Sequence, residues 1–202
     1  MATLALNKTS LHKENERLRT FERFLPTLDL KRKQLLMERA KAAATLASVQ
    51  ADLAALQGIV AAQLPMVSNE LVDLTKLVEV TEVELGTENV VGAHVPVLKS
   101  FKCQTRPYGY LGRPHWVDNI AVRLKETLEV RIQIQVARRR YDLLEIAARK
   151  ITQRVNLFEK VLIPRTKKNI KSIRLFLSDA ERISVVQAKI AKGKQLTEEA
   201  VS

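Results

Sequence analysis

Between Val130 and Leu162, apolar residues recur at alternating steps of four and three for ten consecutive positions. The series is Val130, Ile134, Ala137, Tyr141, Leu144, Ala148, Ile151, Val155, Phe158 and Leu162. These steps place every member on one stripe of a helix, and a period of about 3.5 residues is typical of a left-handed coiled coil. No glycine occurs between Arg113 and Gly193. We therefore predict one long helix from about Trp116 to Lys192, with an apolar seam that it cannot bury alone.

The N-terminal part carries a second stripe of the same period. From Leu25 to Val67, ten of the thirteen positions reached by steps of three and four are apolar. This pattern predicts a first long helix from about residue 10 to residue 77. Pro26 and Pro65 each remove a backbone donor and should mark a start, kink or end of that helix.

Pro164 is the one proline inside the C-terminal pattern. Because Ile170, Ile173 and Leu177 resume a helical spacing after it, we expect a bend or a loosened turn there, not a helix end.

The segment between the two predicted helices has a different amino-acid composition. Residues 78–101 are rich in Val and Thr, which predicts a β-hairpin with its turn near Gly86 to Asn89. Residues 103–114 contain Pro and Gly and read as a loop.

These elements predict an all-α fold: a long antiparallel two-helix coiled coil with a small central β-hairpin and loop. The segments are the N-terminal helix (1–77), the insertion (78–115) and the C-terminal helix with a polar tail (116–202). Both termini should lie at one end of the helix pair and the β element at the other. The assigned seam residues are Leu35, Leu46, Val49, Leu53, Leu56, Ile134, Tyr141, Leu144, Ile151, Val155, Phe158 and Leu162.

Catalytic signatures are missing from the sequence. His12, His94 and His115 fall in three different regions, and none has a His or Cys neighbour at metal spacing. Cys103 and His115 are the only Cys–His pair near in sequence, and they bracket the predicted loop. Phosphate-binding glycine motifs are also missing. We predict no catalytic, cofactor-binding or metal-binding residue, and no enzymatic activity in this chain.

The N-terminus has no signal-peptide core, and we expect no stretch to approach the roughly 18 apolar residues of a membrane span. The single cysteine suits a reducing compartment. Together these features favour a cytosolic protein.

The net charge of +12 is concentrated in one segment. Residues 120–194 hold 19 Lys and Arg against 7 Asp and Glu. Such a segment favours an acidic partner, which could be nucleic acid, an anionic membrane or a protein surface. Aromatic residues do not interleave with the basic ones, as they do in single-strand binders. On these features alone, a structural coiled coil ranks ahead of a nucleic-acid-binding protein, and an enzyme ranks third.

Two stretches resemble a known family. RVNLFEKVLIPRTKKNIKSIRLFLSD (154–179) closely resembles the C-terminal helix of the D subunit of the V-type and archaeal-type rotary ATPases. LPTLDLKRKQLLMER (25–39) resembles its N-terminal helix, and the likeness extends over nearly the whole chain. In that family, the D subunit is the central rotor axle, a coiled coil inserted into a hexamer of A and B subunits. ATP is bound and hydrolysed on the hexamer, so the resemblance implies a non-catalytic subunit without cofactors.

The resemblance also implies partners. They are the A and B subunits, the small rotor F subunit, and the C or d subunit that docks on the membrane ring, with no nucleic acid and no direct membrane insertion. The complex would couple ATP hydrolysis or synthesis to proton or sodium transport, and the chain would be cytoplasmic and peripheral to the membrane. The residues expected to face the hexamer are Pro164, Arg165, Lys167, Lys168, Lys171 and Arg174. The alternatives are a prefoldin-like helical-hairpin chaperone and a basic coiled-coil nucleic-acid-binding protein.

Overall fold

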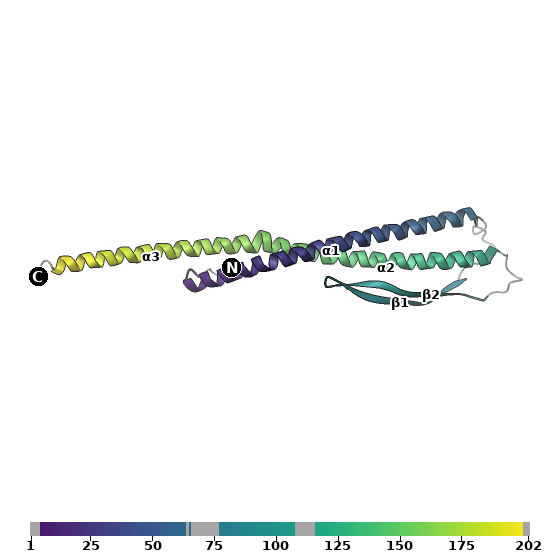
Figure 1. The fold of residues 1–202 in the computed structure, drawn as a ribbon, viewed down its shortest axis with the longest axis horizontal. Helices are drawn as coiled ribbons and strands as arrows, with labels where there is room; N and C mark the ends of the chain where they lie inside the picture. The colour runs from purple at the N-terminus through teal and green to yellow at the C-terminus, as the bar shows by residue number, and fades with distance from the viewer. Residues whose placement is uncertain (1–4, 64, 66–76, 108–115, 200–202) are drawn as a thin grey trace. The chain divides into compact units, whose positions relative to one another are not determined.

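The computed structural model describes residues 5–63, 65, 77–107 and 116–199, with side chains up to residue 193. Long helices flank a small antiparallel hairpin, which confirms the predicted fold class (Figure 1). The elements in order are α1 (Lys8–Gln63), β1 (Val78–Val90), β2 (Ala93–Thr105), α2 (Trp116–Leu157), the π-helix η3 (Phe158–Leu162) and α3 (Ile163–Glu199). They form two compact units, Met1–Leu30 with Ile151–Ser202, and Lys31–Lys150. We call these the first and the second unit.

Helix α1 begins with an asparagine cap. The Oδ1 atom of Asn7 accepts a hydrogen bond of 2.7 Å from the Ser10 backbone N–H, which satisfies one of the free donors of the first turn. The helix continues through Pro26 and ends at Gln63, two residues before Pro65. Pro26 therefore neither starts nor ends it. Residues 66–76, the last part of the predicted first helix, lie outside the described residues.

The expectation that no stretch approaches the apolar length of a membrane span is wrong for α1. By length and composition, α1 contains a stretch apolar enough to cross a membrane, with a mean hydropathy of 1.3 over 18 residues. Asp52 is the only charged residue in positions 42–63, where alanines replace the charges of an ordinary surface helix. In the structure, Leu46, Val49 and Leu53 of this stretch are half-buried at seam spacing. The stretch therefore has the one-sided burial of a paired helix.

The C-terminal helix loosens where the proline pattern predicted. In η3, the Ile163 backbone N–H donates to the carbonyl oxygen of Phe158, five residues earlier. This single wide turn ends two residues before Pro164, and helical structure continues to Glu199. The predicted loosened turn is confirmed, and α2 is described from Trp116 onward.

The hairpin turn lies later than predicted. Val90 pairs with Ala93, so the turn consists of Val91 and Gly92 and not of Gly86 to Asn89. Both turn residues have positive φ, 53° and 89°, as a tight hairpin turn requires. The Gly92 backbone N–H donates to Oδ1 of Asn89 at 2.8 Å, which fixes the turn from one side.

The strands also extend further than the sequence indicated. Gly86 lies inside β1 opposite Val97, and β2 runs on through Cys103 to Thr105, which pairs with Val78. The prediction of a loop from residue 103 is therefore wrong for the first three residues. Cross-strand pairing of β-branched Thr105 and Val78 extends the ladder past the point where Pro and Gly begin. Except for Arg106 and Pro107, the rest of that loop lies outside the described residues, as does His115.

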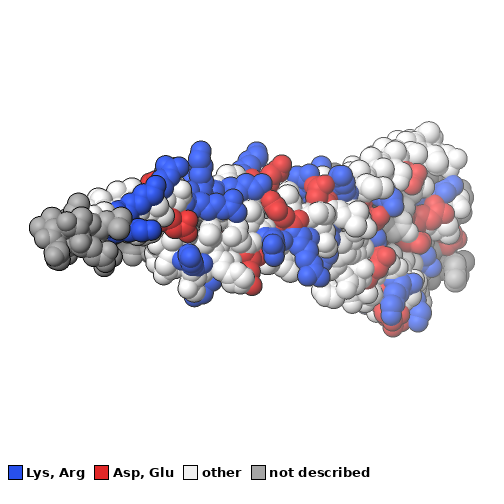
Figure 2. Space-filling model, turned by 60° about the vertical axis from the view of Figure 1, so that its left-hand side comes forward, with Lys and Arg blue, Asp and Glu red and all other residues white. Residues whose placement is uncertain are grey.

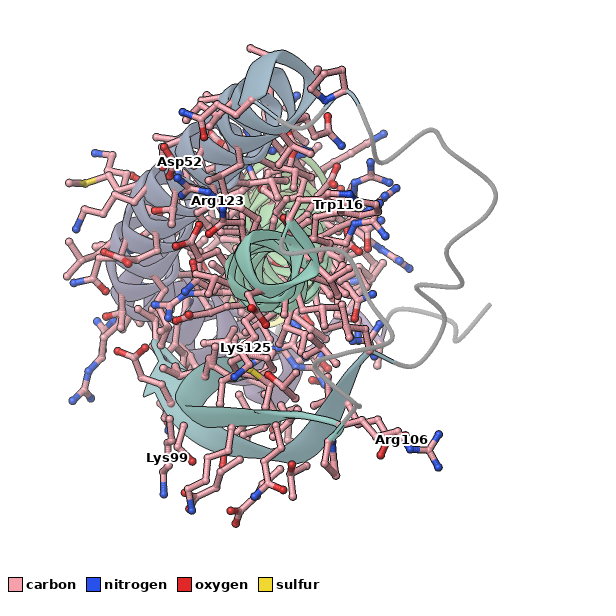
Figure 3. All side chains as sticks on the ribbon, turned by 90° about the vertical axis from the view of Figure 1, so that its right-hand side faces the viewer. Asp52, Lys99, Arg106, Trp116, Arg123 and Lys125 are labelled. Atoms are coloured by element: carbon pink, nitrogen blue, oxygen red, sulfur yellow. The ribbon has the colours of Figure 1, made fainter. Side chains whose placement is uncertain are left out.

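The hairpin folds back along the helices of the second unit. Its base joins a buried cluster of Leu77, Val117, Ile120 and Ala121, against which Val60 of α1 packs. Its tip reaches α2 within the second unit, where Glu88 forms an ion pair of 3.0 Å with Arg140. Within the second unit, only the base of the hairpin therefore lies at the helix ends, where the whole β element was expected. Figure 3 shows Lys99 and Arg106 on the side of the hairpin that points away from the helices.

Two glycine-to-alanine substitutions should have opposite effects. Gly92→Ala places a side chain at φ 89° and should cost about 1 kcal/mol in the hairpin. Gly58→Ala meets no atom within 4 Å and should stabilise α1 by up to about 1 kcal/mol. Amide hydrogen exchange on the full chain measures both, as roughly fivefold faster exchange in the hairpin and slower exchange in α1. Unchanged hairpin exchange in Gly92→Ala would contradict the described turn.

Candidate partner-binding surface of the C-terminal helix

In the first unit, α1 and the C-terminal helix run antiparallel. The rings of Phe21 and Phe158 meet edge to face with centroids 5.4 Å apart. Further toward the start of α1, Glu14 accepts a hydrogen bond of 3.2 Å from the Asn169 side chain. The α1 residue with the lower number contacts the C-terminal residue with the higher number, so the two helices point in opposite directions.

The packed face of this unit is partly polar. Glu14 is only 6% exposed, and its carboxylate accepts from Arg17 at 2.6 Å as well as from Asn169. Thr166 is also buried, and its hydroxyl donates to the carbonyl oxygen of Leu162 at 2.8 Å. Both buried polar groups have partners, so they add specificity to the pairing without an unsatisfied charge.

The six residues predicted to face a partner lie on α3, and all of them are exposed. We call the five cations among them, Arg165, Lys167, Lys168, Lys171 and Arg174, the basic band. Lys167 forms an ion pair of 3.1 Å with Glu22 of α1. The other four form no ion pair within the described part of the chain.

The basic band winds around the helix. Four of its members are spaced by three residues, so each is turned about 60° from the one before. The charge is therefore spread over an arc and does not converge on one point. Figure 2 shows Lys and Arg outnumbering Asp and Glu on the visible face of the part that carries α3.

A hollow of about 490 Å³ lies beside the start of the band, between α1 and α3. Lys13, Arg17 and Arg165 line it with three cations, against the single carboxylate of Glu14. Such a hollow suits an acidic side chain better than a neutral one.

Comparison with known proteins identifies the family. Residues 10–193 match the family described as the D subunit of ATP synthase. The chain belongs to the ATP synthase D-subunit family. It is 33% identical to a V-type ATP synthase D subunit from Borreliella burgdorferi over 192 residues, 95% of each chain. It is 36% identical to the protein of the same name from Chlamydia felis, covering 95% of this chain and 93% of the relative.

Members of the D-subunit family form the central stalk of rotary ATPases, and the predicted family and function are confirmed at that level. The comparisons give no support to the prefoldin-like alternative.

One surface of this D-subunit chain was not predicted from the sequence. Phe176, Ile183 and Ile190 recur every seven residues on α3, and each is about half exposed. Every residue from 179 to 193 is exposed, because α1 begins at Lys8 and no other described segment lies beside this part of α3. We call Phe176, Ile183 and Ile190 the outer stripe. Its heptad spacing can be read from the sequence, but only the exposure of its residues in the structure shows that they do not belong to the seam.

The twelve predicted seam residues are all buried or half-buried. Leu35, Leu144, Ile151 and Val155 are buried, and the remaining eight are half-buried. Leu144 is fully enclosed, and Val155 is 2% exposed. This burial is compatible with the seam assignment in both units.

The residues considered for other chemistry are dispersed. His12 contacts Glu16 one turn away at 3.2 Å, and His94 pairs with Asn89 across the hairpin. Cys103 is half-buried on β2, and its proposed neighbour His115 is outside the described residues. Within the described residues, no three His, Cys, Asp or Glu side chains converge to hold a metal ion.

Proposed function

We propose that this chain is the shaft of the rotor in its complex. In this account, α1 and α3 of the first unit insert into the hexamer of A and B subunits. Rotation of the shaft then couples ATP hydrolysis or synthesis on the hexamer to proton or sodium transport through the membrane ring. The chain itself is non-catalytic and binds no cofactor.

The observation that carries this proposal is the arrangement of the exposed cations around α3. Four cations of the basic band have no ion-pair partner among the described residues, and the band is wound around the helix. A shaft that turns past three similar sites needs contacts that are weak at any one angle. Exposed ion pairs contribute only about 0 to 1 kcal/mol each, so a distributed band meets that need.

The outer stripe supports the same placement. Ile183 and Ile190 belong to a part of α3 that has no described helix beside it, and Phe176 is exposed just before that part; exposed apolar stripes of this kind mark interaction sites. We propose that the hexamer encloses this end of α3. The basic band would then face acidic or carbonyl-lined loops, and the hollow beside Arg165 would accept an acidic side chain.

The remaining partners follow from the family. We propose that the second unit binds the small rotor F subunit and that the complex docks on the ring through the C or d subunit. The chain would be peripheral on the cytoplasmic face, without direct membrane insertion and without nucleic acid.

Gentle purification of the tagged full chain from its native cell tests this function. Recovery of the A, B, F and ring-docking subunits in fixed proportion is the expected result. Recovery of RNA or DNA in a salt-sensitive complex, without those subunits, would refute the proposal and favour the nucleic-acid-binding alternative.

A further inference from the structure

The two helices of the first unit have different repeat lengths. On α1, Leu11, Leu18 and Leu25 are half-buried and recur every seven residues. This face keeps a strict heptad through the whole unit. A partner helix that followed the same repeat would present buried residues at multiples of seven.

The C-terminal helix departs from that repeat by one residue. Its buried Ile151 and Ile173 are 22 positions apart, and so are Val155 and Leu177. Three heptads span 21 positions, so one extra residue lies between these pairs. Ile151 is 8% exposed, Val155 2% and Ile173 0%. Seam residues are therefore buried both before and after the extra residue.

The burial pattern changes phase at η3: its last residue, Leu162, is still half-buried on the heptad, and Thr166 is the first buried residue one position late. A π-turn closes its hydrogen bond over five residues instead of four, and therefore takes up one residue more than a turn of α-helix. The bond from Ile163 to Phe158 is of this kind. Phe158 before the wide part of the turn and Asn169 after it both contact α1, so the pairing is kept across η3.

Proline alone does not account for the wide turn. Pro26 lies inside α1, which is α-helical on both sides of it and has no π-turn. Pro164 is the second residue after η3, and a wide turn relieves the clash of its ring with the preceding carbonyl. Pro164 is therefore compatible with the turn, and the 22-residue spacing of the seam matches the one residue that the turn adds.

The turn decides which residues of α3 face outward. A strict heptad from Phe158 would bury Arg165, and one from Ile151 and Val155 would bury Ser172 and Phe176. In the structure these three residues are exposed, and Thr166, Ile173 and Leu177 take the inner positions.

We propose that η3 is a one-residue phase correction that turns Arg165, Ser172 and Phe176 out of the seam. It thereby creates the outward face of α3, where the basic band meets the outer stripe. Only the use of that face by the hexamer rests on the proposed function. The phase correction is a property of the chain alone and is tested without partners.

Two single-residue deletions test the phase correction. Lys160 lies inside η3 and Lys171 lies beyond it, and both are exposed lysines, so their removal changes the charge equally. Both deletions are made in the full chain with Pro164→Ala, which removes the cost of a proline in a regular helix. The variant Ile173→Cys, in a Cys103→Ser background, supplies a single thiol whose labelling rate reports whether position 173 is buried.

Deletion of Lys160 should convert η3 to α-helix and leave the thiol at position 173 buried, with slow labelling as in the undeleted chain. Deletion of Lys171 should turn that thiol outward and raise its labelling rate at least about tenfold. It should also lower Tm by about 5 °C or more, because apolar residues leave the seam.

Fast labelling at position 173 after deletion of Lys160 would overturn the proposal, as would equal labelling in the two deletion variants. A hexamer-binding assay then separates the two claims by comparing the Lys160 deletion variant with the undeleted Pro164→Ala chain, because Pro164 is itself among the residues expected to face the hexamer. Slow labelling with lost binding would leave the phase correction intact and contradict the proposed use of the outward face.

Discussion

Reversing the charge of all five residues of the basic band to Glu should weaken binding of the chain to the A/B hexamer about 100-fold at moderate salt. Each exposed ion pair contributes about 0 to 1 kcal/mol, and reversal replaces attraction by repulsion. A total of about 3 kcal/mol over five positions corresponds to that factor. The measurement is the dissociation constant of hexamer and full chain at two salt concentrations, with the smaller loss at higher salt.

The matched control reverses five exposed cations of α2, namely Arg131, Arg138, Arg139, Arg149 and Lys150. The net charge then changes by the same amount at positions outside the proposed hexamer surface. This variant should bind the hexamer within about threefold of the unchanged chain. Equal loss in both variants would show that only net charge matters. Unchanged binding of the band variant would remove the basic band from the account.

Leu144→Ala should destabilise the chain by about 3 kcal/mol and lower Tm by roughly 6–12 °C. Leu144 is fully buried on α2 and is one of the ten consecutive apolar residues of the seam. Its truncation removes contacts and leaves a cavity between helices that have little other core. Thermal unfolding of the full chain, followed by helical circular dichroism, measures the change.

Leu157→Ala is the matched control, because the same atoms are removed from a side chain that is 47% exposed. Its effect should stay within about 0.5 kcal/mol. If the two variants unfolded at the same temperature, the seam would not be the source of stability.

The sequence predicted the helices because their signal is long and repeated. The ten-position series, which lies on α2 and η3, predicted the C-terminal helix. The position of η3 was predicted only as a loosened turn near Pro164. The 22-residue spacing behind it becomes visible once the burial of Ile173 and Leu177 is known.

The hairpin shows where local signals fail. Gly86 and Gly92 are equal candidates for a turn in the sequence, and the choice depends on strand register. The Asn89 side chain bonds to Gly92 and fixes the later turn. The return of the tip to Arg140 is a tertiary contact, which no local pattern encodes.

For the candidate surface, the sequence predicted which residues are exposed but not which contacts they make. That the cations of the basic band are exposed follows from their charge. The ion pair of Lys167 with Glu22 and the hollow beside Arg165 depend on how α1 and α3 face each other. The outer stripe shares the heptad of Val155 and Leu162, so sequence alone assigns it to the seam.

Rotation of the chain within the hexamer tests the central claim most directly. The A/B hexamer is fixed to a surface, and a bead is attached to the chain through Lys99→Cys in a Cys103→Ser background. Lys99 lies on the hairpin side that points away from the helices. The account predicts that ATP makes the bead turn in one direction, and that a crosslink between α3 and the hexamer stops both the bead and ATP turnover. A bead that stays still while the hexamer hydrolyses ATP at its full rate would contradict it.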